Sequence, residues 1–162
     1  MIVGSRRQGS RRRPPWSAPG TVPAVDPDVT LASVVYWRRS LWNGRRCVPV
    51  LMTLDQGRLR ARDRHGAEVF AAPVGQVRGR LTRLGTLLLT VDGRRYDVVG
   101  RGSDISPSPS PDQRRGLDEF WAHRTPPSGD GPGFLDLAFN GAAAFHTRSW
   151  RDALARAGAA VR

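Results

Sequence analysis

The pattern of apolar and polar positions between residues 45 and 100 is that of short antiparallel strands separated by turns. Strands alternate with a period of two because successive side chains point to opposite faces of a sheet. The clearest piece is TLLLTVDGRRYDVV, in which two β-rich runs flank Asp92-Gly93. Asp-Gly is typical of a two-residue type I′ turn, whose central residues both need positive φ. The segment therefore predicts a β-hairpin.

Further strand candidates surround this hairpin. Asp55-Gln56-Gly57 is typical of a three-residue hairpin loop, and the stretch from Asp63 to Gly66 is typical of a turn. Pro49 predicts an edge position or a bulge, because proline lacks the donor that a ladder needs. The expected strands are 46–54, 58–63, 68–71, 76–82, 86–91 and 94–99, with a seventh at 134–139.

Two segments predict helices or leave the choice open. Residues 29–42 fit either an imperfect strand alternation or a helical stripe, and their β-branched and aromatic residues favour a strand. Near the C-terminus, Ser149 is the expected N-cap of a helix, with Asp152 as its capping-box partner. An apolar stripe at helical spacing follows, with Gly158 near its end. It consists of Trp150, Leu154, Ala157 and Val161.

The remaining composition predicts one domain with a tail and an insertion. Residues 1–28 are rich in Arg, Pro, Ser and Gly, and we expect a disordered basic tail there. Residues 29–162 then form the folded domain. Its Pro/Ser-rich segment 101–133 contains SPSPSP and TPPSGDGPG, which indicate a surface insertion. Within that insertion, residues 112–123 predict a short helix.

Counted from residue 46, seven strands precede one amphipathic helix with Trp150 early in it. This order, and the segment NGRRCVPVLMTLDQGRLRARDRHGAEVFAAPVGQVRGRLTRLGTLLLTVDGRRYDVV, resembles bacterial pleckstrin-homology-like (PH-like, also GRAM-like) domains. The resemblance covers about residues 43–100 and 134–162 and rests on element order and turn placement. It implies an α+β fold, a small mostly antiparallel β-barrel of about seven strands capped by a C-terminal helix. An eighth strand at 29–37 would allow a different β-barrel.

The resemblance also implies a place for a ligand. Many PH-like domains bind phosphoinositides through basic residues around the first hairpin, and others bind proteins. Here Arg58-Leu59-Arg60-Ala61-Arg62 resembles the basic strand that contacts phosphates. The lysine that usually precedes this strand is missing, and Arg45 and Arg46 are the nearby basic residues.

Charge adds to the same picture. The chain carries a formal net charge of +12, and all 26 of its basic residues are Arg. The strongest candidate ligand-binding residues are two alternating sets, Arg58, Arg60 and Arg62, and Arg78 and Arg80. Antiparallel pairing could bring both sets onto one basic face. Like charges directly opposite one another are destabilising, so such a face would favour an anionic partner. The competing interpretation is a solvated outer face with Asp63, Glu68 and Asp97 as counterions.

These observations predict a non-enzymatic binding or adaptor module. Its expected partner is a protein or an anionic membrane surface. The alternatives are nucleic-acid binding through the basic face and tail, and a structural or assembly role. The lone cysteine, Cys47, excludes an intrachain disulfide and favours the cytoplasm, with a peripheral membrane position also compatible. The longest apolar run is shorter than the ~20 residues that span a bilayer.

Catalytic chemistry has no recognisable motif in this chain. Cys47 lies in an apolar run without a nearby His or acid, so we expect a structural thiol. His65, His123 and His146 lack the spacing of metal ligands. Phosphate-loop, dinucleotide-binding, serine-hydrolase and zinc-protease signatures are absent as well. The sequence thus predicts no catalytic residues, no cofactor and no metal.

Overall fold

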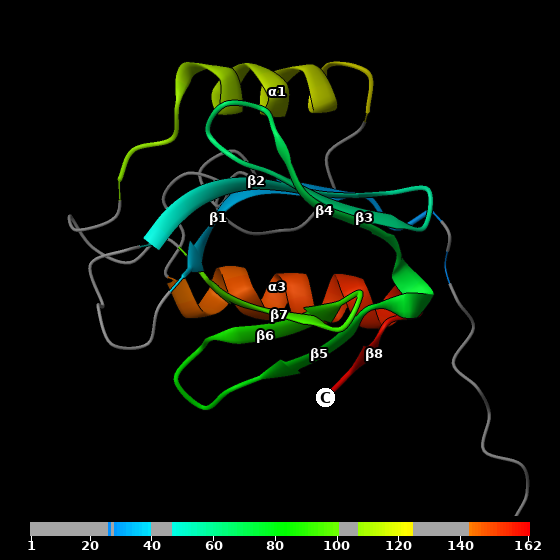
Figure 1. Ribbon diagram of the computed structural model, residues 1–162. Helices are drawn as coiled ribbons and strands as arrows, with labels where there is room; N and C mark the ends of the chain where they lie inside the picture. The colour runs from blue at the N-terminus through cyan, green and yellow to red at the C-terminus, as the bar shows by residue number, and fades with distance from the viewer. Residues whose placement is uncertain (1–25, 27, 40–46, 101–106, 125–142) are drawn as a thin grey trace, which may run out of the picture.

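The computed structural model describes residues 26, 28–39, 47–100, 107–124 and 143–162. Within them, one mostly antiparallel sheet of eight strands is accompanied by two α-helices (Figure 1). The strand order is β4-β3-β2-β1-β7-β6-β5-β8. The elements are β1 (Leu31–Arg38), β2 (Cys47–Asp55), β3 (Arg58–Arg62), β4 (Glu68–Pro73), the 3₁₀ turn η1 (Val74–Gln76), β5 (Arg78–Leu81), β6 (Leu87–Val91), β7 (Arg94–Val99), α1 (Pro111–Ala122), α3 (Ala143–Arg156) and β8 (Ala160–Val161).

β1 joins two halves of this sheet. It pairs with β2 along its whole length, but with β7 only through Tyr36, Trp37 and Arg38. Because that second ladder is short, the β1–β4 half and the β5–β8 half can fold over each other. Their inner side chains belong to one core, which includes Leu59 of β3 and Leu89 of β6. The prediction of a strand within residues 29–42 is therefore confirmed for 31–38.

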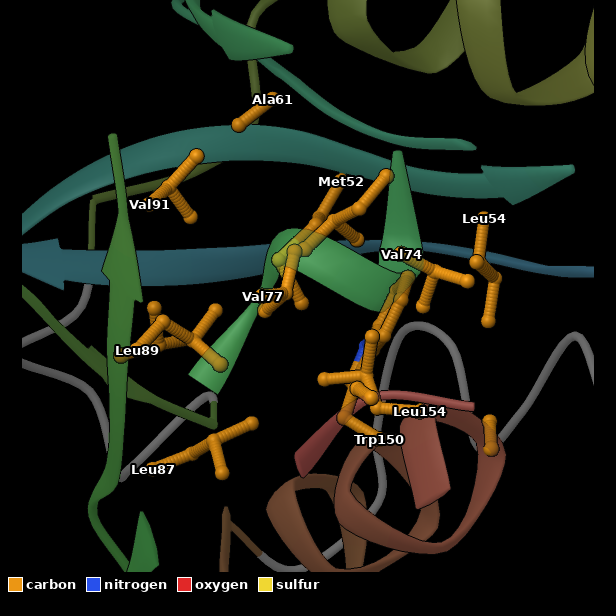
Figure 2. Close-up of a cluster of buried hydrophobic side chains, with 14 of the residues drawn as sticks. Met52, Leu54, Ala61, Val74, Val77, Leu87, Leu89, Val91, Trp150 and Leu154 are labelled. Atoms are coloured by element: carbon orange, nitrogen blue, oxygen red, sulfur yellow. The ribbon is translucent and has the colours of Figure 1, made fainter. Parts of the chain in front are cut away.

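α3 packs on the inner face of the β5–β8 half and supplies the centre of the core. Trp150 and Leu154 are fully buried and lie among Met52 of β2 and Leu89 of β6 (Figure 2). Figure 1 shows α3 between the two halves of the sheet, on the side away from α1. Replacing a buried aromatic residue such as Trp150 by Ala typically costs about 3–5 kcal/mol. The predicted C-terminal helix is thus confirmed as a part of the core.

The start of this helix was wrongly predicted, because polar residues lie in its buried stripe. α3 begins at Ala143, so Ser149 lies inside the helix. His146 and Thr147 are buried although their side chains are polar. Gly158 could either end the helix or weaken its last turn, and the structure shows that α3 ends before it, at Arg156. Gly158 has φ 99, and the amides of residues 158 and 159 donate to the carbonyls of residues 155 and 154. These bonds form a Schellman motif. Val161, expected in the helix stripe, lies in β8.

Two hairpins in the sheet have two-residue turns. In the β6–β7 turn, Asp92 has φ 49 and Gly93 has φ 74, which confirms the predicted type I′ geometry. The β2–β3 turn was expected to have three residues. It has two, Gln56 and Gly57, because Asp55 pairs directly with Arg58 and closes the hairpin one residue earlier.

The expected closure into a seven-strand barrel is wrong. β4 and β5 are joined by η1 but form no ladder with each other, and the sheet of eight strands stays open with β4 and β8 as its two edges. β8 instead pairs in parallel with β5, through Arg78 with Ala160 and Gly79 with Val161. The chain that follows α3 thereby occupies the edge of β5 that a closed barrel would need. The expected strand at 134–139, the tail 1–28 except residues 26 and 28, and much of the insertion lie outside the described residues.

Pro49 was expected at an edge or a bulge, and its position shows why proline is tolerated here. β2 lies between β1 and β3, and Pro49 pairs with Tyr36 of β1. The ladder to β3 begins only at Leu51. At Pro49 the β3 side of β2 therefore has no partner strand among the described residues, so the missing amide proton interrupts no ladder there.

The β6–β7 turn generates a stability test. Gly93→Ala places a side chain on a residue with φ 74, and the left-handed region costs non-glycine residues about 1–2 kcal/mol. We expect the free energy of unfolding, measured by urea denaturation, to fall by about that amount. Gly75→Ala is the matched control, because nothing lies within 4 Å of the added methyl group. Equal losses in the two variants would contradict the assigned turn geometry.

Candidate anion-binding site

The strongest candidate site lies on the outer face of β3. Strand alternation buries Leu59 and Ala61 completely in the core and exposes Arg58, Arg60 and Arg62 on the opposite face. Successive arginines are two residues apart, which corresponds to about 6.8 Å along an antiparallel strand. We call these three residues the β3 ladder. Their exposure, predicted from the alternation, is confirmed.

The neighbours of the β3 ladder leave its charge largely uncompensated. Arg60 lies between Thr53 and Ala71 on the adjacent strands, neither of which is charged. Arg58 is flanked by Asp55, but the Asp55 Oδ2 atom accepts a hydrogen bond from Nη2 of Arg124 at 2.6 Å. Within the described part of the chain, no ion pair involves an arginine of the β3 ladder. An anionic ligand would therefore not have to displace a bound carboxylate.

The acid at the other end of this ladder is Glu68. It lies opposite Arg62 in the register of β3 and β4, and both side chains are exposed. Exposed pairs without a short contact contribute little, because water and salt screen them. Glu68 was one of the counterions proposed for a purely solvated face, together with Asp63 and Asp97. Asp63 instead accepts hydrogen bonds from the backbone amides of His65 and Ala67 in the β3–β4 turn.

α1 covers the outer face of β1 and β2 and leaves the β3 ladder open (Figure 1). Its apolar side, Leu117 and Trp121, packs on Ala32, Val34 and Leu51. This confirms the short helix predicted at 112–123. The helix follows the direction of β2, since its start is bonded near Pro49 and its end near the β2–β3 turn. The β3 ladder consequently runs alongside α1.

Polar contacts fix α1 in this position. The side chain of Gln113 donates from Nε2 to the Pro49 carbonyl at 2.8 Å, and Ser110 Oγ donates to the Arg64 carbonyl at 2.8 Å. Ser110 and Gln113 also form a capping box, in which each side chain accepts from the other residue's backbone amide. This motif was not predicted, although Ser-x-x-Gln before an apolar stripe is its signal in the sequence. α1 is thus a fixed wall rather than a loosely attached loop.

Arg78 and Arg80 lie on a different outer face. They project from β5, with Gly79 and Leu81 directed to the other side. We call them the β5 ladder. Four strands, β2, β1, β7 and β6, separate β3 from β5 in the sheet. Because the two halves share their inner faces in one core, the ladders point to opposite sides of the molecule. The expectation that the ladders pair on one face is therefore wrong.

The β5 ladder lies near a carboxylate that is already paired. Across β6, the same outer face carries Arg95 and Asp97 of β7. Arg95 Nε donates to Asp97 Oδ1 at 2.7 Å, and this hydrogen bond, together with the negative charge, raises the pKa of Arg95. Arg38 lies directly opposite Asp97 in the β1–β7 ladder, and its buried Nε has no hydrogen-bond partner among the residues that the structure describes. Asp97, proposed as a counterion of the candidate arginines, is thus bound to Arg95 instead.

A second polar cluster lies inside the core. Trp150 Nε1 donates to Ser33 Oγ at 2.8 Å, and Ser33 Oγ is 2.7 Å from His146 Nε2. Ser33 is 2% and His146 6% exposed, so no substrate reaches this serine–histidine contact. Burial lowers the pKa of His146 to about 4, so the ring is neutral near pH 7. Its Nε2 can then accept a hydrogen bond from the Ser33 hydroxyl group.

The other residues considered for chemistry lie apart. His65 and His123 are exposed, and Cys47 is half-buried at the first residue of β2. In the ranges that the structure describes, no three His, Cys, Asp or Glu side chains come close enough to hold a metal ion. No role was predicted for Ser33, because its partners His146 and Trp150 lie 113 and 117 residues away in the sequence and no local pattern links them.

His146 predicts a pH dependence of stability. The unfolded residue titrates near 6.5 and the folded one near 4, so the unfolded chain binds more protons between these values. Stability is then fully present above pH 6.5 and falls as the pH drops toward 4. The difference amounts to about 3 kcal/mol.

Urea denaturation across this pH range measures the effect. His146→Phe removes the titrating group from a buried site, so the decline between pH 6.5 and 4 should be smaller by about that 3 kcal/mol. His123→Phe, which replaces an exposed histidine, serves as the control and is measured over the same pH range. An unchanged decline in the His146 variant would contradict the assignment.

Comparison with known proteins adds no assignment: no family model matches the chain, and no significant match appears among curated proteins or solved structures.

Proposed function

We propose that this chain is a non-enzymatic, PH-like binding module that holds a phosphate-bearing partner on the β3 ladder. The observation that carries the proposal is the set of three exposed arginines, two residues apart on one strand, with no ion pair among the described residues. Arginine suits this task because its planar guanidinium can bind two phosphate oxygens at once. A fixed strand also holds the three groups at a constant spacing.

The PH-like part of the proposal is supported by the order of the elements. Two halves of an antiparallel sheet meet at one strand, β1, and a helix near the C-terminus fills the core between them. The β3 ladder lies on the second antiparallel pair, formed by β2 and β3, because β1 already pairs with β2; PH-like domains carry their basic residues around the first hairpin. The open sheet and the additional β8 are departures from that pattern.

The non-enzymatic part is supported by the position of the polar side chains. The serine–histidine contact of Ser33 and His146 lies in the core and is used to hold α3. The exposed face beside α1 offers cations rather than an acid–base pair. In the part of the chain that is described, no helix is long and apolar enough to cross a membrane.

The triple variant Arg58→Ala, Arg60→Ala, Arg62→Ala tests the site with inorganic triphosphate, a probe short enough for one ladder. We expect the affinity, measured by titration calorimetry at low salt, to fall by roughly one to two orders of magnitude. This estimate follows because exposed ion pairs contribute up to about 1 kcal/mol each.

The control variant removes the same charge elsewhere: Arg83→Ala, Arg114→Ala, Arg115→Ala. All three arginines are exposed and lie outside both ladders. The control should bind triphosphate nearly as the unchanged protein does. If both variants lose affinity equally, only the net charge matters and the β3 ladder is not a site.

A further inference from the structure

The two arginine ladders point to opposite sides, yet both reach the same corner of the sheet. Arg58 is the first residue of β3, and it pairs with Pro73, the last residue of β4. Arg78 is the first residue of β5. Only η1, Val74–Gln76, and Val77 lie between Pro73 and Arg78 along the chain. The five residue steps from Pro73 to Arg78 span at most about 18 Å, and one strand spacing of about 5 Å separates Pro73 from Arg58. The near ends of the two ladders therefore lie within about 23 Å of each other along the backbone.

The corner itself contains no charge of either sign. The residues from Pro73 to Val77 are Pro, Val, Gly, Gln and Val, of which Pro73, Gly75 and Gln76 are exposed. The corner is firmly held, because the Val74 amide donates to the Gly57 carbonyl at 2.8 Å and the Val77 amide donates to the Val74 carbonyl at 3.0 Å. A ligand that passes over η1 therefore meets neither a repelling carboxylate nor a mobile loop.

Resting on the proposed phosphate-binding role of the β3 ladder, we infer that one flexible single strand of nucleic acid binds both ladders at once. The strand would run along Arg62, Arg60 and Arg58, bend around η1, and continue along Arg78 and Arg80. These five arginines form a basic track that changes from one outer face to the other. The shared chemistry is a linear phosphodiester backbone, which RNA and DNA both provide.

The bend in the track distinguishes this partner from other polyanions. A bilayer surface is flat over the size of this domain, so it can contact one outer face but not the opposite one. A DNA duplex has a persistence length of about 150 base pairs and does not fold around a corner formed by η1 and Val77 alone. A single strand has no such stiffness, and it can place phosphates against both ladders.

The salt dependence of binding tests this inference. Each arginine that neutralises a phosphate of a single strand adds about 0.7 to the slope of log affinity against log salt concentration. The double variants Arg58→Ala, Arg60→Ala and Arg78→Ala, Arg80→Ala should each lower the slope for a long single-stranded oligonucleotide by about 1.4. The matched variant Arg114→Ala, Arg115→Ala removes the same charge from the exposed side of α1 and should leave the slope unchanged. Far-UV circular dichroism confirms that each variant is folded.

The outcomes separate this inference from the proposed function. If the β3 pair lowers the slope but the β5 pair does not, the bent track is wrong and the β3 site stands. If all three variants behave alike, both are wrong. Equal slope reductions by the two ladder pairs on a duplex of the same length would contradict the bend. Binding to phosphatidylserine vesicles without binding to oligonucleotides would replace nucleic acid by a membrane. Homopolymers of RNA and DNA, compared in parallel, show which backbone is preferred.

Discussion

The fully buried indole of Trp150 holds the two halves of the sheet over one core. It packs between side chains of both halves, and its Nε1 donates to Ser33 of β1. The two halves are joined by only three paired positions between β1 and β7, so the sheet alone would not fix their angle. α3 supplies what the short ladder lacks. The outward directions of both arginine ladders therefore depend on a residue that touches neither of them.

Ser33 and His146 show how a buried polar group can be structural. A hydroxyl in the core needs partners, because an unsatisfied polar group costs about 1–3 kcal/mol when buried. Trp150 donates a hydrogen bond to the Ser33 oxygen, and the neutral ring of His146 can accept a hydrogen bond from the Ser33 hydroxyl group. Residues 146 and 150 are one helical turn apart and contact the same serine, so the cluster also fixes the register of α3 against β1.

Local chemistry explains which parts of the fold were predictable. Asp92-Gly93 specifies its own turn because its backbone angles depend on two adjacent residues. The exposure of Arg58, Arg60 and Arg62 follows from alternation within one strand. The start of α3 was missed because His146 reads as a polar position, and only its partner 113 residues away makes it a core residue. The prediction of a closed barrel was wrong for the same reason, because the pairing of β8 with β5 joins residues that are distant in the sequence. The relation of the two ladders likewise required the strand order, which no local pattern encodes.

The two-residue β8 has a consequence for self-association. A long, flat, unpaired edge strand is a template on which other chains can add strands, and native sheets shorten or interrupt such edges. Here β8 covers part of β5 but is itself only Ala160–Val161. At the other edge, β4 begins with the charged Glu68 and ends at Pro73, which has no amide proton to donate. Both edges of this sheet are thus poor templates, so neither edge favours the addition of a strand from a second copy of the chain.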